Sequence, residues 1–291
     1  MNTSNGNSRD TQTDSLQGKV VVLTGAGGGI ASAIVDRFAR SGSRIVLLEL
    51  RTSSLADAEQ RLAAAGIESV SIECDVADES SVKNAAGRTV EHFGRCDVLI
   101  NNAATLAPAT SIEKLLVADW DRTLAINLRG VFLTTKYLGA LMLNQGSGSI
   151  VNIASIAATA PNASPQYGAS KAAVLAFTRH TAVEWGPRGI RANAVSPGFI
   201  RTPLSESNYA EPEMLARRSN MVPSRRLGLP GDIAEAVAFL AGDGASFING
   251  QELAVDGGFM QTTLMHAQPK AEQYGGWQPA HIDFSAAVPH G

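Results

Sequence analysis

The sequence predicts an α/β fold: a single domain in which a doubly wound parallel sheet lies between two layers of helices. Short runs rich in β-branched residues alternate with helix-length segments along the 291 residues. Most of these runs are apolar throughout, which is typical of strands buried on both faces of a parallel sheet. Glycines end several helical segments a few residues before the next strand, as helix stops do.

Seven runs are predicted to be strands, in chain order Lys19–Thr24, Arg44–Glu49, Ser69–Cys74, Asp97–Asn101, Ser149–Ala154, Arg191–Val195 and Glu252–Val255. Two of the helical segments between them are long, at Val117–Leu143 and Gln166–Trp185. Their apolar content exceeds what one face of a sheet can cover. We therefore expect a homo-oligomer.

Three segments of different composition divide the chain. Residues 1–15 are rich in Asn, Ser and Thr without an apolar core, which predicts a disordered leader rather than a secretory signal. Residues 16–260 carry the predicted domain. Residues 261–291 lack periodicity, and they are either a loosely ordered extension or a strap across a neighbouring subunit or its active-site mouth.

The composition of the chain limits the kinds of partner that it could bind. The net charge of −3 and the pI near 6.0 give no basic field for nucleic acid or an anionic membrane. No apolar run approaches the roughly twenty residues that span a bilayer, so we expect a cytoplasmic protein. Cys74 and Cys96 are predicted to be reduced packing residues, and the histidines show no ligand spacing, so we predict no metal site.

A glycine-rich turn follows the first strand directly. Gly25 to Ala31 reads Gly-Ala-Gly-Gly-Gly-Ile-Ala and runs into the helical segment Ser32–Arg40. Glycines at a strand-to-helix turn let the backbone approach a pyrophosphate, which the helix N-terminus then stabilises. The turn therefore predicts a dinucleotide site.

The end of the second strand bears on the choice of dinucleotide. Glu49 could accept hydrogen bonds from the adenosine ribose hydroxyls, which favours NAD, or it could be an ordinary strand-end carboxylate. Arg51 leaves NADP open as the alternative. Asp75 and Val76, after the third strand, are either part of the adenine pocket or the start of a helix.

A tyrosine and a lysine form the second candidate site. Tyr167 and Lys171 are four residues apart on a predicted helix and so share one face. To act as acid and base near neutral pH, the tyrosine pKa must fall by about three units, which an ammonium group and the nicotinamide ring could cause. Ser155 ends a strand where ligands gather. Asn127 is a polar residue between apolar neighbours, or else a kink or a buried amide.

The chain resembles the short-chain dehydrogenase/reductase family over about residues 16–260. The resemblance rests on Thr24-Gly25, Asn101-Asn102-Ala103-Ala104, Asn127, Ser155, Tyr167 with Lys171, and Pro197-Gly198, in this order. It implies a Rossmann fold with Tyr167 as catalytic acid/base, and a homotetramer or dimer formed through the two long helical segments. It further implies that Lys171 lowers the tyrosine pKa and holds the nicotinamide ribose, that Ser155 orients the substrate oxygen and that Asn127 supports a proton relay.

The resemblance also implies a nicotinamide-facing loop from Pro197 to Thr202 and a role for Asn101 in closing the adenosine side of the cleft. The predicted cofactor-binding residues are Gly25, Gly27, Gly28, Gly29, Ile30, Glu49, Asp75, Val76, Asn102, Ala103, Ala104, Tyr167, Lys171, Pro197, Gly198, Ile200 and Thr202. Three features depart from the family pattern: Ala31 and Ala104 each replace a glycine, and the Ser155-to-Tyr167 spacing is about one residue short.

These patterns predict an NAD-dependent oxidoreductase that transfers a hydride between the nicotinamide and a secondary alcohol or ketone. The alternatives are an NADP-dependent carbonyl reductase and a non-catalytic dinucleotide sensor of the same fold. The segment from Leu204 to Gly228 resembles a substrate lid. Its arginines either bind a substrate carboxylate or form a solvated helix face, and apolar residues near the site, such as Phe199, favour an aliphatic, cyclic or aromatic alcohol.

Overall fold

The computed structural model describes residues 15–106, 109–203, 205–206 and 211–262. The predicted leader therefore lies outside the described residues except for Ser15, and the predicted extension lies outside them except for Gln261 and Thr262. Across the part that is described, no helix combines the length and the apolar content needed to span a lipid bilayer.

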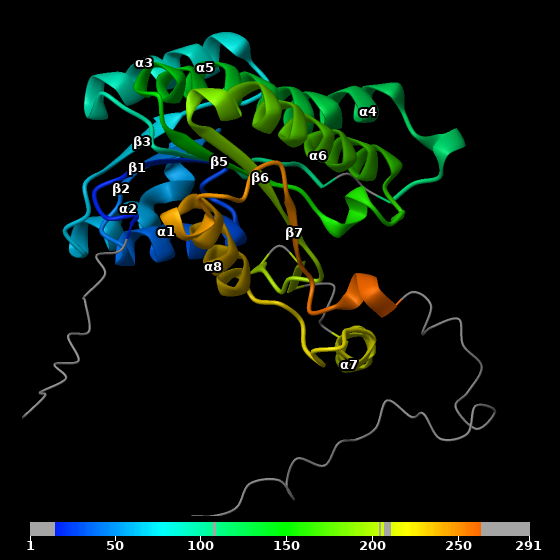
Figure 1. Cartoon of the computed structure of the whole chain (residues 1–291). Helices are drawn as coiled ribbons and strands as arrows, with labels where there is room; N and C mark the ends of the chain where they lie inside the picture. Colours follow the sequence, from blue (N-terminus) through cyan, green and yellow to red (C-terminus); the bar gives the residue numbers. More distant parts are fainter. Residues whose placement is uncertain (1–14, 107–108, 204, 207–210, 263–291) are drawn as a thin grey trace, which may run out of the picture.

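Seven parallel strands form one sheet in the order β3-β2-β1-β4-β5-β6-β7 (Figure 1). All seven predicted strands are confirmed, each within two residues of its predicted bounds. They are β1 Val20–Thr24, β2 Arg44–Glu49, β3 Ser69–Glu73, β4 Val98–Asn101, β5 Gly148–Ile153, β6 Ile190–Pro197 and β7 Glu252–Val255.

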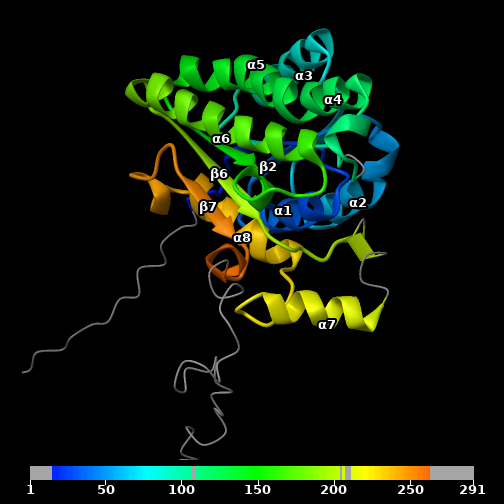
Figure 2. The same cartoon turned by 90° about the vertical axis from the view of Figure 1, so that its right-hand side faces the viewer.

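Helices cover both faces of the sheet (Figures 1 and 2). One layer contains α1, α2 and α8, the other contains α3, α4, α5 and α6, and α7 lies outside both layers. Their bounds are α1 Gly29–Arg40, α2 Ala56–Ala64, α3 Glu79–Phe93, α4 Val117–Leu124, α5 Gly130–Gln145, α6 Pro165–Trp185, α7 Pro212–Met221 and α8 Pro230–Ala241.

The two layers explain why the central strands lack an alternating pattern. In β1, Val21 and Leu23 pack into the core beneath α1 and α8, whereas Val20 and Val22 pack into the core beneath α3 and α5. Each strand residue therefore meets an apolar layer whichever way it points. The edge strand β7 differs, because Glu252, Leu253 and Ala254 are exposed.

The prediction of one continuous helix over Val117–Leu143 is wrong in one respect, because this helix is interrupted. A wider, π-helical turn at Ala125–Arg129 separates α4 from α5. Asn127 lies in this turn with its side chain fully buried, and the amide bonds to Thr105 and Ser170 outside its own helix. Single π-helical turns inside α-helices occur frequently at functional sites.

The strand order reverses between β1 and β4. From this point the chain builds outward through β2 and β3 on one side and through β5, β6 and β7 on the other. The crossover helices that follow β1 and β4 thus lie on opposite faces, which leaves a crevice at the carboxyl ends of the strands. Ligands of open parallel sheets bind at such a crevice.

Candidate active site

A cleft of about 860 Å³ opens at the carboxyl ends of the central strands. Its volume lies within the range of small-molecule and cofactor sites. Every residue predicted to bind the cofactor lines this cleft, as do Ser155, Tyr167 and Lys171. Asn127 is not among the lining residues and lies behind the wall that Ile126 forms.

The glycine-rich turn packs too closely for side chains. Gly25 has a φ of +63°, and a Cβ there would lie 2.7 Å from the Ala103 Cα. A Cβ on Gly27 would lie 2.8 Å from the Ser54 Oγ. The absent third glycine causes no conflict, because Ala31 is fully buried in the apolar core under α1.

The N-terminus of α1 faces this cleft and fits a pyrophosphate. Gly28 is its N-cap, and no side chain caps the helix. The first turn also contains no acidic residue. Backbone N–H groups at such a terminus attract an anion through hydrogen bonding and the helix dipole. A dinucleotide therefore suits the residues present.

Hydrogen bonds join the ends of β1 and β4 beside the glycine turn. The Thr24 Oγ1 accepts hydrogen bonds from the backbone N–H groups of Asn102 and Ala103, both at 3.0 Å. In return, the Asn102 Nδ2 donates to the carbonyl oxygens of Thr24 at 3.1 Å and Gly25 at 3.0 Å. The two strand ends thus form one continuous floor for the cleft.

Asn101 does not close the adenosine side as expected. It is 2% exposed, and its side chain bonds to Asn152 and to Thr134 of α5 instead. Successive strand residues point to opposite faces, so Asn101 faces the helical layer while Asn102 reaches the cleft.

Two carboxylates, those of Glu49 and Asp75, line the cleft. The Glu49 Oε2 accepts a hydrogen bond from the Gly27 N–H at 2.8 Å, and its Oε1 accepts one from the Leu50 N–H at 2.8 Å. Asp75 also lines the cleft, but it does not start a helix. The N-cap of α3 is Asp78, whose carboxylate accepts a bond from the Ser81 N–H at 2.7 Å.

Ser155, Tyr167 and Lys171 meet where β5 ends against α6. The Ser155 hydroxyl hydrogen-bonds to Tyr167, and the Lys171 Nζ lies 5.7 Å from the centroid of the tyrosine ring. The Lys171 Nζ donates a hydrogen bond of 2.7 Å to the Ile153 carbonyl oxygen. The short spacing between Ser155 and Tyr167 therefore still brings both side chains together.

The acidity expected for Tyr167 is not found in the protein alone. Burial raises the pKa of its phenol, and the hydrogen bond from Ser155 offsets only part of that effect. Burial lowers the pKa of Lys171 to about 8. A positively charged ligand bound beside the phenol would lower this pKa.

Asn127 connects the cleft wall to the helix of Tyr167. Its Oδ1 accepts a hydrogen bond from the Thr105 N–H at 2.8 Å, and its Nδ2 donates to the Thr105 carbonyl oxygen and the Ser170 Oγ, both at 3.1 Å. The Ser170 hydroxyl in turn donates to the Tyr167 carbonyl oxygen at 2.7 Å. Asn127 is thus both the buried amide and the bend considered from the sequence, and its relay role stays a prediction.

Two arginines at the lid pair with carboxylates, and a third packs on an aromatic ring. Arg226 pairs with Asp232, with N–O distances of 2.6 and 2.8 Å, and Arg201 pairs with Glu206. The Arg218 guanidinium lies 5.4 Å from the centroid of the Phe199 ring. No arginine of the described residues is among those that line the cleft, so the lining gives no support to the alternative in which these arginines bind a substrate carboxylate.

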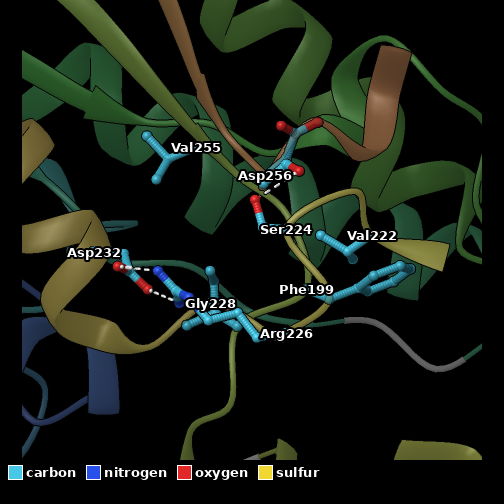
Figure 3. A pocket seen from close by; sticks show the side chains of 10 residues that line it. Phe199, Val222, Ser224, Arg226, Gly228, Asp232, Val255 and Asp256 are labelled. Atoms are coloured by element: carbon cyan, nitrogen blue, oxygen red, sulfur yellow. Dashed lines mark hydrogen bonds and ion pairs between the residues drawn. The ribbon is translucent and has the colours of Figure 1, made fainter. Parts of the chain in front are cut away.

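A second cavity of about 90 Å³ lies where the lid joins the sheet (Figure 3). Figure 3 shows the Arg226–Asp232 pair on one side of it and Phe199 and Val222 on the other. The two stems of the lid meet at an isolated parallel bridge between Ile200 and Gly228. The cavity therefore belongs to the base of the lid.

Sequence reasoning missed several residues of the cleft. They carry no motif, but two of them directly follow Ala104, so their place after a strand end is a usable signal. The missed residues are Ser32, Leu50, Cys74, Thr105, Leu106, Ile126, Ile153, Ala154, Pro203 and Ser205.

The chain is similar to known proteins over most of its length. The family model described as enoyl-(acyl carrier protein) reductase matches residues 25–260. D-threitol dehydrogenase of Mycolicibacterium smegmatis is 42% identical over 247 residues, which cover 84% of this chain and 94% of that relative.

Solved structures agree with this. NAD⁺-bound xylitol dehydrogenase is 34% identical with a TM-score of 0.79, and the match covers 84% of this chain and 99% of that chain. A structure from Beutenbergia cavernae, assigned to an NAD(P)-dependent gluconate 5-dehydrogenase with NADP at low occupancy, is 34% identical with a TM-score of 0.80, covering 85% and 98%. With the glycine turn, the paired asparagines and the Ser-Tyr-Lys group in one cleft, these matches show that the chain belongs to the short-chain dehydrogenase/reductase family of oxidoreductases.

Proposed function

We propose that this protein is an NAD-dependent oxidoreductase that transfers a hydride between the nicotinamide and a secondary alcohol or ketone, with Tyr167 as general acid/base. The observation that carries the proposal is the convergence of Ser155, Tyr167 and Lys171 in the same cleft as the glycine-rich turn. The non-catalytic alternative is less well supported, because it gives no reason to bury an ammonium group beside a phenol.

In the oxidation direction, each residue of the site has a separate role. When bound, NAD supplies the hydride acceptor and a positively charged ring. Tyr167 takes the proton of the substrate hydroxyl, while the Ser155 hydroxyl holds the substrate oxygen by a hydrogen bond. Lys171 stabilises the phenolate by its charge and donates hydrogen bonds toward the nicotinamide ribose. Opposite charges nearby lower the pKa of a phenol, which offsets the effect of burial at Tyr167.

Glu49 supports NAD over NADP. Its carboxylate stands at the end of β2 beside Gly27, 2.8 Å from that N–H. In this position it can accept hydrogen bonds from ribose hydroxyls, and it repels a 2′-phosphate. Arg51, which kept NADP open as an alternative, does not line the cleft. The similar structures include one bound to NAD⁺ and one bound to NADP.

A neutral substrate suits the cleft best. The charged residues that line the described part of the cleft are Glu49, Asp75 and Lys171. The two carboxylates belong to the proposed adenosine end and the lysine to the reaction centre. The remaining wall near Ser155 is apolar or carries hydroxyl groups. Two relatives are named for neutral polyols, D-threitol and xylitol, and we extend this class of alcohol to the present chain.

The proposed active form is a homo-oligomer, a dimer or a tetramer. Large apolar side chains on the outer layer of helices stay open to solvent in one copy: Val117 and Trp120 on α4, Phe132 on α5 and Val183 on α6, which is 79% exposed. Exposed apolar patches of this kind mark protein interfaces. A second copy of the chain is the proposed partner, because the same helical face of two copies can pack together around a two-fold axis.

Tyr167→Phe should lower kcat about 10²- to 10⁴-fold with a neutral secondary alcohol such as xylitol and NAD⁺, because the proton acceptor is removed while the ring remains. NADH affinity, measured by fluorescence titration, should stay within about twofold of the unmodified protein. Tyr137→Phe is the control, since Tyr137 lies on α5 outside the cleft. Retention of most activity by Tyr167→Phe would rule out its proposed role.

Glu49→Gln should weaken NAD⁺ binding about tenfold and strengthen NADP⁺ binding by a similar factor, because the charge that favours ribose hydroxyls and repels phosphate is lost. Glu73→Gln is a matched control: Glu73 is the register partner of Glu49 on the neighbouring strand and does not line the cleft. Titration of each protein with both dinucleotides measures the ratio. An unchanged ratio in Glu49→Gln would contradict the assignment.

Lys171→Met should stabilise the dinucleotide-free protein at pH 7. Because burial lowers the pKa of Lys171 from 10.5 to about 8, the folded state carries the full cost of a buried ammonium below pH 8. That cost falls as the pH rises toward 10.5, where the unfolded chain also loses the proton. We expect a gain of about 1–3 kcal/mol in the free energy of unfolding at pH 7, and a smaller gain at pH 10.

Urea unfolding at the two pH values measures this difference. Lys114→Met, at an exposed lysine, should show neither the gain nor its pH dependence. If Lys171→Met were less stable than the parent at pH 7, the buried ammonium group would not be destabilising the folded protein.

Light scattering should give a mass that is two or four times the 30.4 kDa of one chain. Val183→Glu places a charge in the proposed contact, and the mass should fall toward that of a single chain because an unpaired buried charge is costly. Gln60→Glu changes an exposed polar residue of α2, in the opposite helical layer, and should leave the mass unchanged. A single-chain mass for the unmodified protein would exclude the proposed assembly.

A further inference from the structure

Apolar burial alone does not fix the rotation of α6, the helix that carries Tyr167 and Lys171. Val174 and Leu175 are buried against the sheet, whereas Val183 is exposed on the opposite side. Exposed alanines add to that outer side, at Ala169, Ala172 and Ala176. These apolar residues on the outer side weaken the preference of α6 for one rotation, compared with a strictly amphipathic helix. Successive residues differ by about 100°, so a rotation of α6 by one residue position would turn both catalytic side chains out of the cleft.

A buried polar chain crosses from the sheet to α6. The Thr134 hydroxyl of α5 donates to the Asn101 Oδ1 at 2.6 Å, and the Asn101 Nδ2 donates to the Asn152 Oδ1 at 2.8 Å. The Asn152 Nδ2 then donates to the Thr178 Oγ1 of α6 at 2.8 Å. All four residues are at most 2% exposed. Asn101 and Asn152 are direct partners in the register of β4 and β5.

The Thr178 hydroxyl acts both as a hydrogen-bond acceptor and as a donor. It accepts the bond from Asn152 and donates one of 2.8 Å to the Val174 carbonyl oxygen within α6. Burying polar groups in an apolar layer is unfavourable unless each has a partner. Because hydrogen bonds are directional, this chain can be satisfied in one rotation of α6 and not in its neighbours. It thus supplies the specificity that the apolar contacts lack.

The same strand holds Lys171. Thr178 and Lys171 are seven residues apart, about two turns along one side of α6, and they bond to adjacent residues of β5. Asn152 binds Thr178, and the Ile153 carbonyl oxygen accepts the 2.7 Å bond from the Lys171 Nζ. The helix is therefore attached to β5 at two points, one structural and one within the active site.

We propose that Asn152 and Thr178 are positioning residues: their hydrogen bond sets the rotation of α6 and so directs Tyr167 and Lys171 into the cleft. The proposal rests on the function proposed above for Tyr167. Neither residue lines the cleft, so both act through the helix and not on substrate.

Three substitutions test the proposal. Thr178→Val keeps the shape of the side chain but removes the acceptor for Asn152, whereas Thr178→Ser keeps the hydroxyl. Thr181→Val is the matched control, because Thr181 is a buried threonine of the same helix whose hydroxyl donates to the Phe177 carbonyl oxygen. We expect Thr178→Val to lower kcat about 10- to 100-fold and to change its pH profile, with dinucleotide affinity kept within about twofold. Thr178→Ser should regain most of kcat, and Thr181→Val should resemble the parent.

A second readout does not depend on turnover. The titration of Tyr167 can be followed by phenolate absorbance, as the difference from Tyr167→Phe, with and without NAD⁺. Its midpoint should change in Thr178→Val but not in Thr181→Val. If the parent protein has no activity with alcohols, the proposed function fails, and this titration still decides whether Thr178 positions Tyr167.

A Thr178→Val protein with the parent's kcat, pH profile and Tyr167 midpoint would overturn the proposal, even if its melting temperature were lower. Should Thr178→Val fail to fold, Thr178→Cys provides a side chain of similar size whose sulfur is a poor acceptor. The same outcomes then apply to it.

Discussion

The active site depends on the hydrogen bond between the Lys171 ammonium and the Ile153 carbonyl. The lysine is 2% exposed, and no carboxylate offsets the lowering of its pKa by burial. Its charge is therefore kept in the interior by the packing of a long helix on a strand. Without that helix in place, neither the ammonium nor the phenol would stay near the carboxyl end of β5.

The core layers on the two faces of the sheet differ in composition. Beneath α1 and α8 the core is formed by aliphatic and aromatic residues such as Phe38 and Ile34, and close packing is sufficient there. Beneath α5 and α6 the core also contains amides and hydroxyls. Buried polar groups contribute less to stability than to the choice of one arrangement. The polar layer lies on the side where the reacting groups must be aimed.

Sequence reasoning predicted the strands and 18 of the 28 residues that line the cleft, because these follow from local rules. Apolar runs define buried strands, and glycines or polar residues just after a strand end lie at the carboxyl edge of the sheet. A kink at Asn127 was considered only as an alternative, since the break at Ala125–Arg129 depends on bonds from Asn127 to residues far away in the chain. The orientation of Asn101 and the ion pairs of the lid arginines were missed for the same reason.

The contact between Gly25 and Ala103 links two distant parts of the sequence. Their backbones approach so closely that a methyl group on residue 25 would overlap the main chain of residue 103. Enlarging the glycine cannot be compensated by shrinking its neighbour, because the obstacle is backbone and not side chain. A library that seeks altered dinucleotide preference should therefore leave this crossing untouched and diversify positions around Glu49 and Ser54 instead.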